Sequence, residues 1–311
     1  MQRNRVENVL KAIFAMSFSL ALDRAAWADM YLNSAEPLCS GDDPTVLMCD
    51  DFEDGDWVIK NCDQANSSGG LAQTDGWCGT IYWRPDPQGT NFGRCGGLGA
   101  AGTDCAITSD VRTTATNGGQ MGLHAFKNDS TQTDIYLRWY HYLMPGFQPG
   151  HEKVMMIHDQ SRGQHHTLFF PFGSREMDIQ TVYPDARLAQ NQGNGISLQN
   201  GRWYYIEMHS WLASCVGCAD GGYELWIDDC GASGTGCTGP GTMRLRYANQ
   251  ANRPSAQTAF LEMWLENWAN TPSSGEERYD QFVIATRRVG PMSPKAADVV
   301  APGRPGNLGL R

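Results

Sequence analysis

The sequence predicts an all-β protein, because short alternating strands recur along the chain while convincing helical periodicity is rare. Apolar and polar residues alternate in short runs, and clusters of glycine, asparagine, aspartate and proline separate these runs. Glycine is abundant, with 35 residues in a chain of 311. Such a pattern is typical of a β-sandwich or a β-barrel. The length is sufficient for one large domain or two small ones.

The first segment of the chain has the pattern of an export signal. A basic start that includes Arg3 and Lys11 leads into an apolar run at 12–22, and "AWA" at 26–28 supplies the small residues of a cleavage site. The apolar run is too short to span a bilayer as a stable helix, although an N-terminal membrane anchor is the alternative interpretation. We therefore expect a signal peptide at 1–28 and a secreted, soluble mature protein, either extracellular or periplasmic.

The alternating runs then predict strands along most of the chain. The expected strands are 45–53, 134–144, 152–159, 165–172, 175–183, 202–212, 222–229, 259–268 and 280–289. Residues 60–120 have weak periodicity, and we interpret them as a disulfide-tied loop excursion of the same domain. The stretch 292–311 is rich in proline and has no periodicity, which predicts a disordered tail. The sequence therefore predicts a single folded domain at 29–291.

The cysteines agree with export. All ten cysteines follow the predicted signal peptide, and their number is even. In an exported protein this indicates disulfides rather than metal ligands or catalytic thiols. The spacing favours sequential local pairs, although the sequence leaves the connectivity open. The "CVGC" motif at 215–218 also fits a redox pair or half of a zinc site, but no second CxxC follows it.

The net charge limits the choice of partner. Removing 1–28 takes away four basic and two acidic residues, so the mature charge is 20 − 32 = −12. This charge argues against nucleic acid or an anionic membrane as a partner. It also argues mildly against a polyanionic substrate. We expect a monomer.

One face of the strand 202–212 has an unusual composition. Alternate positions form one mostly apolar stripe, and the other stripe combines aromatic and ionisable residues: Trp203, Tyr205, Glu207, His209 and Trp211. Two other strands repeat this pattern, with Tyr136, Arg138, Tyr140 and Tyr142 on one and Phe260, Glu262, Trp264, Glu266 and Trp268 on the other. Such a stripe is often ordinary surface. Three stripes on one sheet would favour a binding groove.

The motifs "CDDFEDGDW", "GRWYYIEMHSWL…DGGYELWIDD" and "YDQFVIATRRVGP" resemble the concanavalin A-like lectin/glucanase jelly roll over 45–291. The order "DIYLRWYHYLMPGF", "KVMMIHD", "WYYIEMHSWL", "YELWIDD" is similar to bacterial proteins related to jelly-roll polysaccharide lyases. This resemblance implies two packed antiparallel sheets, one of them concave, with a groove that binds a sugar chain. The stripe from Trp203 to Trp211 would then line the groove, because aromatic rings stack on pyranose rings.

A lyase of this group cleaves by β-elimination, which needs a partner for the uronate carboxylate, a base and an acid. The expected carboxylate-facing groups are Arg138 and His158, and the acid/base candidates are Tyr140, Tyr205 and His209. The expected substrate-binding residues are Trp203, Trp211, Trp264, Glu207 and Glu266. "MIHD" at 156–159 resembles the Q-I/V-H strand of alginate lyases, but Met156 replaces the glutamine and the Y-x-K-x-G-x-Y-x-Q strand is missing. These differences argue against alginate, and a buried structural role for His158 is the alternative.

Two other classes of function stay open. A glycoside hydrolase needs two carboxylates, ~5–5.5 Å or ~6.5–9.5 Å apart, and Glu207, Glu262 and Glu266 are the candidates. "EMDIQT" at 176–181 resembles the E-x-D-x-x-E strand of jelly-roll β-glucanases, but Thr181 replaces the acid/base glutamate. A non-catalytic lectin would use the aromatic groove alone. A metal-dependent oxidase, with the "HH" at 165–166 and His158 as copper or zinc ligands, is less well supported, because no family spacing matches it.

The acidic stretch "DDFEDGD" at 50–56 predicts a cation site. The jelly-roll resemblance implies a structural calcium ion on the convex side, between the first and last strands. Its ligands would be Glu53, Gly55 and Asp280, which offer the oxygen atoms that calcium prefers. A plain solvated acidic turn is the alternative interpretation.

Overall fold

A computed structural model gives the fold of this chain. The predicted signal peptide and, apart from Met292, the predicted C-terminal tail lie outside the residues it describes. Within the described part, no helix is long and apolar enough to cross a membrane. The described residues are 37–40, 43–50, 52, 78–82, 92–94, 99–100, 103, 106–112, 120–125, 131–150, 152–159, 164–170, 174–181, 196–237, 239–269 and 274–292.

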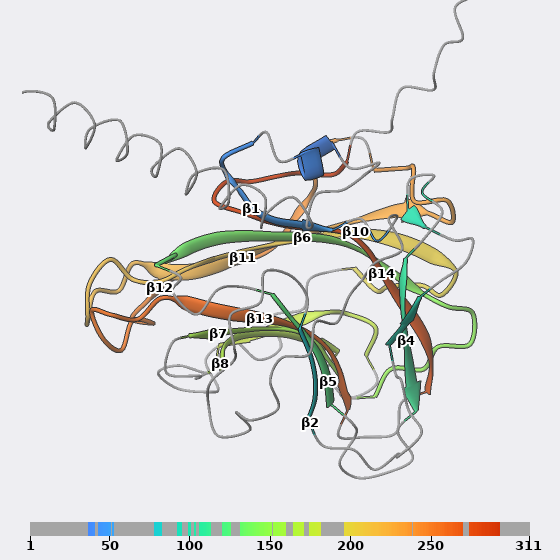
Figure 1. Cartoon of the computed structure of the whole chain (residues 1–311), viewed down its shortest axis with the longest axis horizontal. Helices are drawn as coiled ribbons and strands as arrows, with labels where there is room; N and C mark the ends of the chain where they lie inside the picture. The colour runs from blue at the N-terminus through green and yellow to red at the C-terminus, as the bar shows by residue number, and fades with distance from the viewer. Residues whose placement is uncertain are drawn as a thin grey trace, which may run out of the picture.

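Two antiparallel sheets form a sandwich (Figure 1). Sheet A has eight strands in the order β12-β11-β10-β6-β14-β4-β3, and β1 also pairs with β14. Its strands are β1 (Val46–Asp50), β3 (Phe92–Arg94), β4 (Ile107–Arg112), β6 (Asp134–Leu143), β10 (Arg202–Trp211), β11 (Gly221–Gly231), β12 (Met243–Gln250) and β14 (Ser274–Ala285).

Sheet B has six strands in the order β2-β5-β13-β7-β8-β9. Its strands are β2 (Cys78–Tyr82), β5 (Gln120–Ala125), β7 (Glu152–Asp159), β8 (Gln164–Phe170), β9 (Asp178–Thr181) and β13 (Phe260–Ala269). A short 3-10 helix, η1 (Pro37–Ser40), precedes β1. Sheet A bows over sheet B, so the face of sheet A turned away from the core is convex (Figure 1). The predicted two-sheet β-sandwich, a jelly roll, is confirmed.

The hydrophobic core lies between the sheets and is built from the apolar stripes that the alternation predicts. On β10, Tyr204, Ile206 and Met208 pack into it, and on β6 it receives Leu137 and Trp139. Burial of such side chains contributes ~25 cal/mol per Å² of apolar surface removed from water, so these stripes determine which face of each strand turns inward. The other stripe of each strand turns outward.

The segment 60–120 is more ordered than the sequence indicates. Strands β2, β3 and β4 lie inside it and β5 begins at its end, so these residues contribute to both sheets. The interpretation of the whole segment as a loop excursion is wrong. Strand β12 was also missed. Periodicity fails for β2, β3, β4 and β5 because each has only three to six residues, too few to show a clear alternation.

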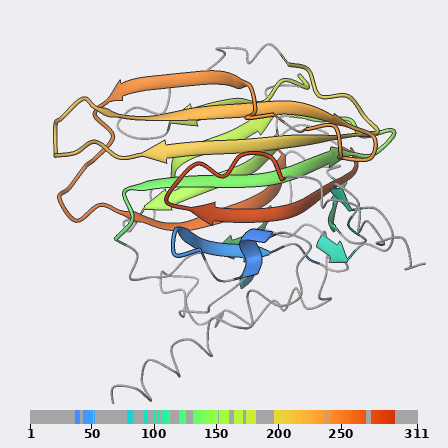
Figure 2. The ribbon, with the colours of Figure 1, turned by 90° about the horizontal axis from the view of Figure 1, so that it is seen from above.

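The last predicted strand is displaced. We expected 280–289, but β14 begins at Ser274 and ends at Ala285. A bulge interrupts its pairing with β6 between Asp280 and Val283, and Gln281 there adopts a positive φ of 52°. The residues that follow β14 leave the sheet and cross its outer face (Figure 2).

Sequential local disulfides are confirmed for the pairs that the structure describes. These are Cys39–Cys49, Cys215–Cys218 and Cys230–Cys237. The "CVGC" motif is therefore a disulfide rather than half of a zinc site. The remaining cysteine pairs lie outside the described side chains.

Polar groups inside the core are paired with one another. His141 Nε2 lies 2.9 Å from a Glu277 carboxylate oxygen, and the Tyr279 hydroxyl donates to the other oxygen at 2.6 Å. His166 on β8 and Ser210 on β10 are 2.8 Å apart and connect the two sheets through the core. Such pairing reduces the cost of burying polar atoms.

Candidate functional site

The aromatic and ionisable stripe of β10 lies on the outer face of sheet A, but most of it is covered. Three of its members, Trp203, Tyr205 and Glu207, have 0% exposed surface, as do Arg138 and Tyr140 beside them on β6. A polysaccharide cannot contact a side chain that has no exposed surface, and this face is convex rather than concave (Figure 1). The prediction that these five residues line an open groove is therefore wrong for this structure.

The chain after β14 forms part of the cover. We call residues 286–292 the C-terminal strap, and Figure 2 shows this red segment lying on top of the strands of sheet A. The Arg288 guanidinium lies over the Trp226 ring, 4.3 Å from its centroid. Near the end of the strap, the Met292 amide donates to the Tyr140 hydroxyl at 2.9 Å. The C-terminal strap therefore covers the outer face of β6 and β10.

Glu207 holds the strap in place. Its carboxylate accepts hydrogen bonds from the amide of Val289 at 2.6 Å and from the amide of Gly290 at 3.0 Å. The Tyr205 hydroxyl also donates to this carboxylate, and Arg288 Nε lies 3.6 Å from it. Burial, and then the neighbouring Glu207 charge, raises the pKa of Tyr205 far above its usual range. Tyr205 therefore stays protonated and is poorly suited to act as a base.

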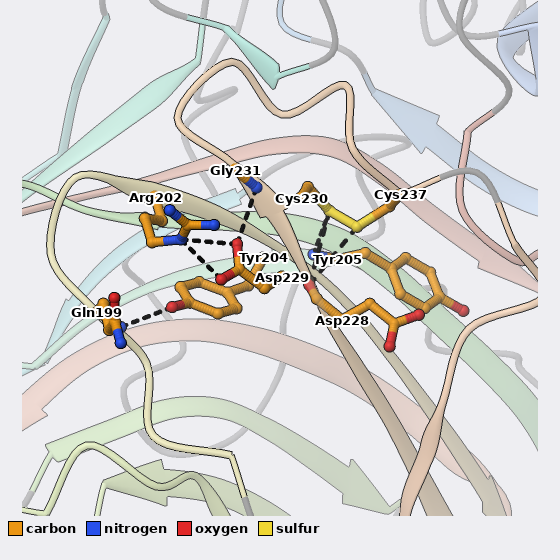
Figure 3. A network of polar contacts seen from close by, with 9 residues as sticks. All are labelled: Gln199, Arg202, Tyr204, Tyr205, Asp228, Asp229, Cys230, Gly231 and Cys237. Atoms are coloured by element: carbon orange, nitrogen blue, oxygen red, sulfur yellow. Dashed lines mark hydrogen bonds and ion pairs between the residues drawn. A yellow bond between two sulfur atoms is a disulfide. The ribbon is translucent and has the colours of Figure 1, made fainter.

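A disulfide-bonded loop covers the other side of Tyr205. Figure 3 shows the Tyr205 ring beside the Cys230–Cys237 disulfide, and the Tyr205 amide donates to Cys230 Sγ at 3.1 Å. Gly241, further along the loop, has a φ of 80°, and a Cβ there would lie 2.7 Å from the Tyr205 ring. Glycine therefore satisfies both the backbone conformation and the close approach.

The far end of the stripe stays partly exposed and forms a stack of rings. His209 lies between Tyr136, with ring centroids 3.9 Å apart, and Trp211, at 4.5 Å. The two imidazole nitrogens are 2.8 Å from Asp134 and 3.2 Å from Glu224. Because both nitrogens already have carboxylate partners, this arrangement fits a structural role better than the predicted acid/base role.

Asp280, the described member of the predicted calcium ligands, is engaged in the fold. One carboxylate oxygen accepts from the Ala100 amide at 2.7 Å and from the Thr103 hydroxyl at 2.9 Å, and the other accepts from the Gln281 amide at 2.7 Å. Glu53 and Gly55 lie outside the described residues. Among the residues whose side chains are described, no group of three or more His, Cys, Asp or Glu residues could hold a metal ion.

The third stripe belongs to the other sheet. Strand β13 carries Glu262, Trp264 and Glu266, and it lies in sheet B rather than beside β6 and β10. The core therefore separates these positions from Glu207, so the expectation of one shared groove, and of a hydrolytic pair that includes Glu207, is wrong. A bulge between Phe260 and Glu262 also places Phe260 in the core, not on the stripe as predicted.

On sheet B, the register brings chemically versatile residues into rows. The described side chains in these rows are His158, Met156 and Thr167, which are 5%, 0% and 1% exposed, and they alternate along β7 and β8 with the core residues Met155, Ile157 and Leu168. In one row, His158 on β7 pairs with Glu262 on β13 and with Gln164 on β8. The next row crosses all six strands and consists of Gln180, Thr167, Met156, Trp264, His124 and Cys78.

His158 is the predicted catalytic residue that the fold places in these rows. It is 5% exposed, whereas Arg138, Tyr140 and Tyr205 have no exposed surface. Both of its ring nitrogens are buried in this structure, so a substrate could reach them only if the surrounding chain moved. The rows of sheet B around His158 are our candidate functional site because their register brings histidine, glutamate and glutamine positions together; the described side chains in these rows are covered in this structure.

Sequence reasoning missed the neighbours of His158 in these rows. His124 lies on β5, a strand that was not predicted, and Gln164 is the first residue of β8, which was predicted to begin one residue later. Gln180 was interpreted only as part of an incomplete β-glucanase motif. The alternation Gln120, Gly122, His124 in β5 is the signal that could have identified the first of these. His166, one of the three histidines considered as metal ligands, is fully buried instead.

The two bowed antiparallel sheets define a jelly-roll sandwich, and known structures share it. The cellulose-induced protein Cip1 is similar at a TM-score of 0.50 and 17% identity, over 78% of this chain and 99% of that chain. An alginate lyase from Aplysia kurodai is similar at a TM-score of 0.48 and 9% identity, over 63% of this chain and 87% of that chain. Alginate lyase vAL-1 from Chlorella virus is similar at a TM-score of 0.45 and 10% identity, over 68% of this chain and 93% of that chain. No family model matches the chain, and no curated protein matches it in sequence.

Proposed function

We propose that this protein is a secreted carbohydrate-active enzyme that cleaves a polysaccharide by β-elimination on the outer face of sheet B. The observation that carries this proposal is the row in which His158 pairs in register with Glu262 and Gln164. Trp264 lies in the next row, where an aromatic ring suits stacking on a sugar ring. The jelly-roll fold is compatible with this activity but does not determine it.

In this mechanism His158 removes the C5 proton beside the uronate carboxylate, because an imidazole is a suitable base near neutral pH. The bond from C4 to the glycosidic oxygen then breaks, and the imidazolium of His158 donates its proton to that leaving oxygen. Glu262, its cross-strand neighbour, would favour the imidazolium that forms. The substrate carboxylate also needs a partner that stabilises the developing charge. On this face, the neutral amides of Gln164 and Gln180 and the imidazole of His124 are the residue types available for that role.

The spacing along β13 argues against hydrolysis by the predicted carboxylates. Glu262 and Glu266 are four residues apart on one extended strand, so their Cα atoms are ~13 Å apart. Retaining and inverting hydrolases place their two carboxylates ~5–5.5 Å and ~6.5–9.5 Å apart. Since Glu207 lies on the other sheet, a lyase is the better interpretation, despite a mature charge that favours neutral glycans.

Incubation with a panel of polyuronates and neutral glucans tests the proposal. A lyase raises both the absorbance of the unsaturated uronate and the number of reducing ends. A hydrolase raises only the reducing ends, and a lectin binds without raising either. Either of the last two results would overturn the proposal.

Two matched variants locate the active face. We expect His158→Asn to lower turnover by at least ~100-fold, the usual contribution of an acid/base group, with little change in binding. Tyr205→Phe keeps its ring on the covered face of sheet A, so it should keep full turnover. Full turnover in His158→Asn together with a large loss of turnover in Tyr205→Phe would contradict this site. It would favour the residues on sheet A that the sequence predicted: Arg138, Tyr140, Tyr205 and His209.

We also propose that the chain is exported and that residues 1–28 are removed. The three described disulfides support this, because such bonds persist in oxidising compartments. Mass spectrometry of the secreted protein should find a start near Asp29 and no free thiol. An intact segment 1–28, or alkylation of the native protein without reductant, would contradict it.

We retain a structural calcium site at Asp280, Glu53 and Gly55 as a proposal. The side-chain amide of Gln281 has 0% exposed surface and no hydrogen-bond partner among the described residues. A bound calcium ion would give its carbonyl oxygen a partner. Asp280 and the carbonyl oxygen of Gln281 are the oxygen donors that calcium prefers. The ion would stabilise the fold and would take no part in the chemistry.

A further inference from the structure

We propose that the Cys215–Cys218 disulfide is a reversible thiol-exchange site, which reacts with a low-molecular-weight thiol of the glutathione class while the rest of the protein stays folded. This pair closes the β10–β11 connection, at the end of the sheet away from the Cys230–Cys237 loop. The proposal is independent of the activity on sheet B.

Accessibility separates this disulfide from the others that the structure describes. Cys215 is exposed and Cys218 is half-buried. By contrast, Cys39, Cys49 and Cys230 are 1% exposed and Cys237 is 5% exposed. A thiolate must reach the sulfur that it attacks, so exposed disulfides are the labile ones, whereas buried ones resist reduction.

The turn that carries the disulfide is also held by other bonds. The Cys218 amide donates to the Cys215 carbonyl at 3.1 Å, and Gly217 supplies the positive φ of 80° that the turn requires. At the base of the connection, Ser214 donates from its amide and its hydroxyl to Asp220, at 2.8 and 2.6 Å. Reduction should therefore leave the turn, and the strands on either side of it, in place.

A second anchor fastens the base of this connection to the rest of sheet A. The Asn252 side chain accepts from the Ala213 amide at 2.7 Å and donates to the Trp211 carbonyl at 2.9 Å. Since the disulfide spans only three residues, it removes less chain entropy from the unfolded state than a bond that closes a long loop. The fold therefore depends little on this bond, which leaves it available for exchange.

Arg253 gives the site an electrostatic bias. Its Nη1 lies 3.4 Å from the Ala213 carbonyl oxygen and 3.2 Å from that of Ser214, the residue just before Cys215. A cation held close to a cysteine favours its thiolate, which is both the leaving group and the nucleophile in exchange. The carboxylate of Asp220 acts in the opposite sense, but Ser214 already binds both of its oxygens.

The chemistry balances with the thiol as the reductant. A glutathione thiolate attacks the exposed Cys215 sulfur, a mixed disulfide forms there, and Cys218 leaves as a thiolate. A second glutathione thiolate attacks the glutathione sulfur of that mixed disulfide and releases oxidised glutathione and the Cys215 thiolate. Both cysteine thiolates then take up protons according to the pH. Oxidised glutathione reverses the sequence.

The experiment equilibrates the full-length folded protein in glutathione buffers of graded reduced-to-oxidised ratio, quenches with acid and alkylates the free thiols. Peptide mass spectrometry then reports each pair. We expect Cys215 and Cys218 to be labelled at ratios where the four cysteines of the Cys39–Cys49 and Cys230–Cys237 disulfides are not, while the melting temperature changes by no more than a few degrees. Glutathione attached to Cys215 should be found at intermediate ratios.

The double variant Cys215→Ser/Cys218→Ser is the control, and it should lose the first labelling step while the remaining steps are unchanged. Cys230→Ser/Cys237→Ser is the matched comparison, because it removes a buried bond and should lower the melting temperature much more. Labelling of all pairs together as the protein unfolds would overturn the proposal. So would a Cys215–Cys218 bond that is reduced last.

Discussion

Replacing Glu207 by glutamine should loosen the C-terminal strap and destabilise the protein. The two carboxylate oxygens accept from the amides of Val289 and Gly290, one oxygen each, and the Glu207 side chain itself has 0% exposed surface. Glutamine has the same shape but only one acceptor oxygen. In either orientation its NH₂ group faces a backbone N–H, so one donor is left unsatisfied and the charge that bound Arg288 is lost.

The expected cost follows from the burial of this cluster. Removing one partner of a buried, hydrogen-bonded charge costs roughly 3–5 kcal/mol. This is a large part of a typical stability of ~5–15 kcal/mol. For a domain of this size, 1 kcal/mol corresponds to ~2–4 °C, so Glu207→Gln should lower the melting temperature by roughly 6–20 °C.

Two assays measure the effect. Differential scanning calorimetry gives the melting temperature, and limited trypsin digestion at low temperature reports the strap, because Arg287 and Arg288 lie in it. We expect faster cleavage at these arginines in the variant. The control is Glu276→Gln, whose side chain is 36% exposed and paired with Arg278, and which should cost less than ~1 kcal/mol. An unchanged melting curve and digestion pattern for Glu207→Gln would refute the clamp.

Two further predictions concern acid stability and calcium. Hydrogen bonds from Thr45, followed by the Arg287 contact, lower the pKa of Asp43 to about 2. A depressed folded-state pKa gives stability that is complete above the unfolded value of 3.8 and is lost as the pH falls towards 2. Asp43→Asn should therefore reduce the drop in melting temperature between about pH 5 and pH 2.5, and an unaltered drop would contradict this. If the proposed calcium ion binds the folded state, a chelator should lower the melting temperature of the wild type but not that of Asp280→Ala. An unchanged wild-type melting temperature in the presence of the chelator would contradict the calcium site.

The alternation in the sequence was sufficient to predict the sandwich and much of its core. The inward stripes of β6 and β10, with Leu137, Trp139 and Ile206, pack as their period of two requires. A one-residue shift would expose the whole stripe, so the hydrophobic effect specifies this choice strongly. The limits of β7 and most of β10 were also correct.

The same alternation could not determine what lies against the outward stripes. Glu207 and Tyr205 look like groove residues in the sequence, but the strap that covers them comes from Val289 and Gly290, more than 80 residues away. Likewise, the sequence could not assign β13 to sheet B, which is what brings Glu262 beside His158. Periodicity along a strand is local and divides its residues between two faces. Which strands become neighbours, and which outer face stays accessible, depends on long-range pairing that only the tertiary structure decides.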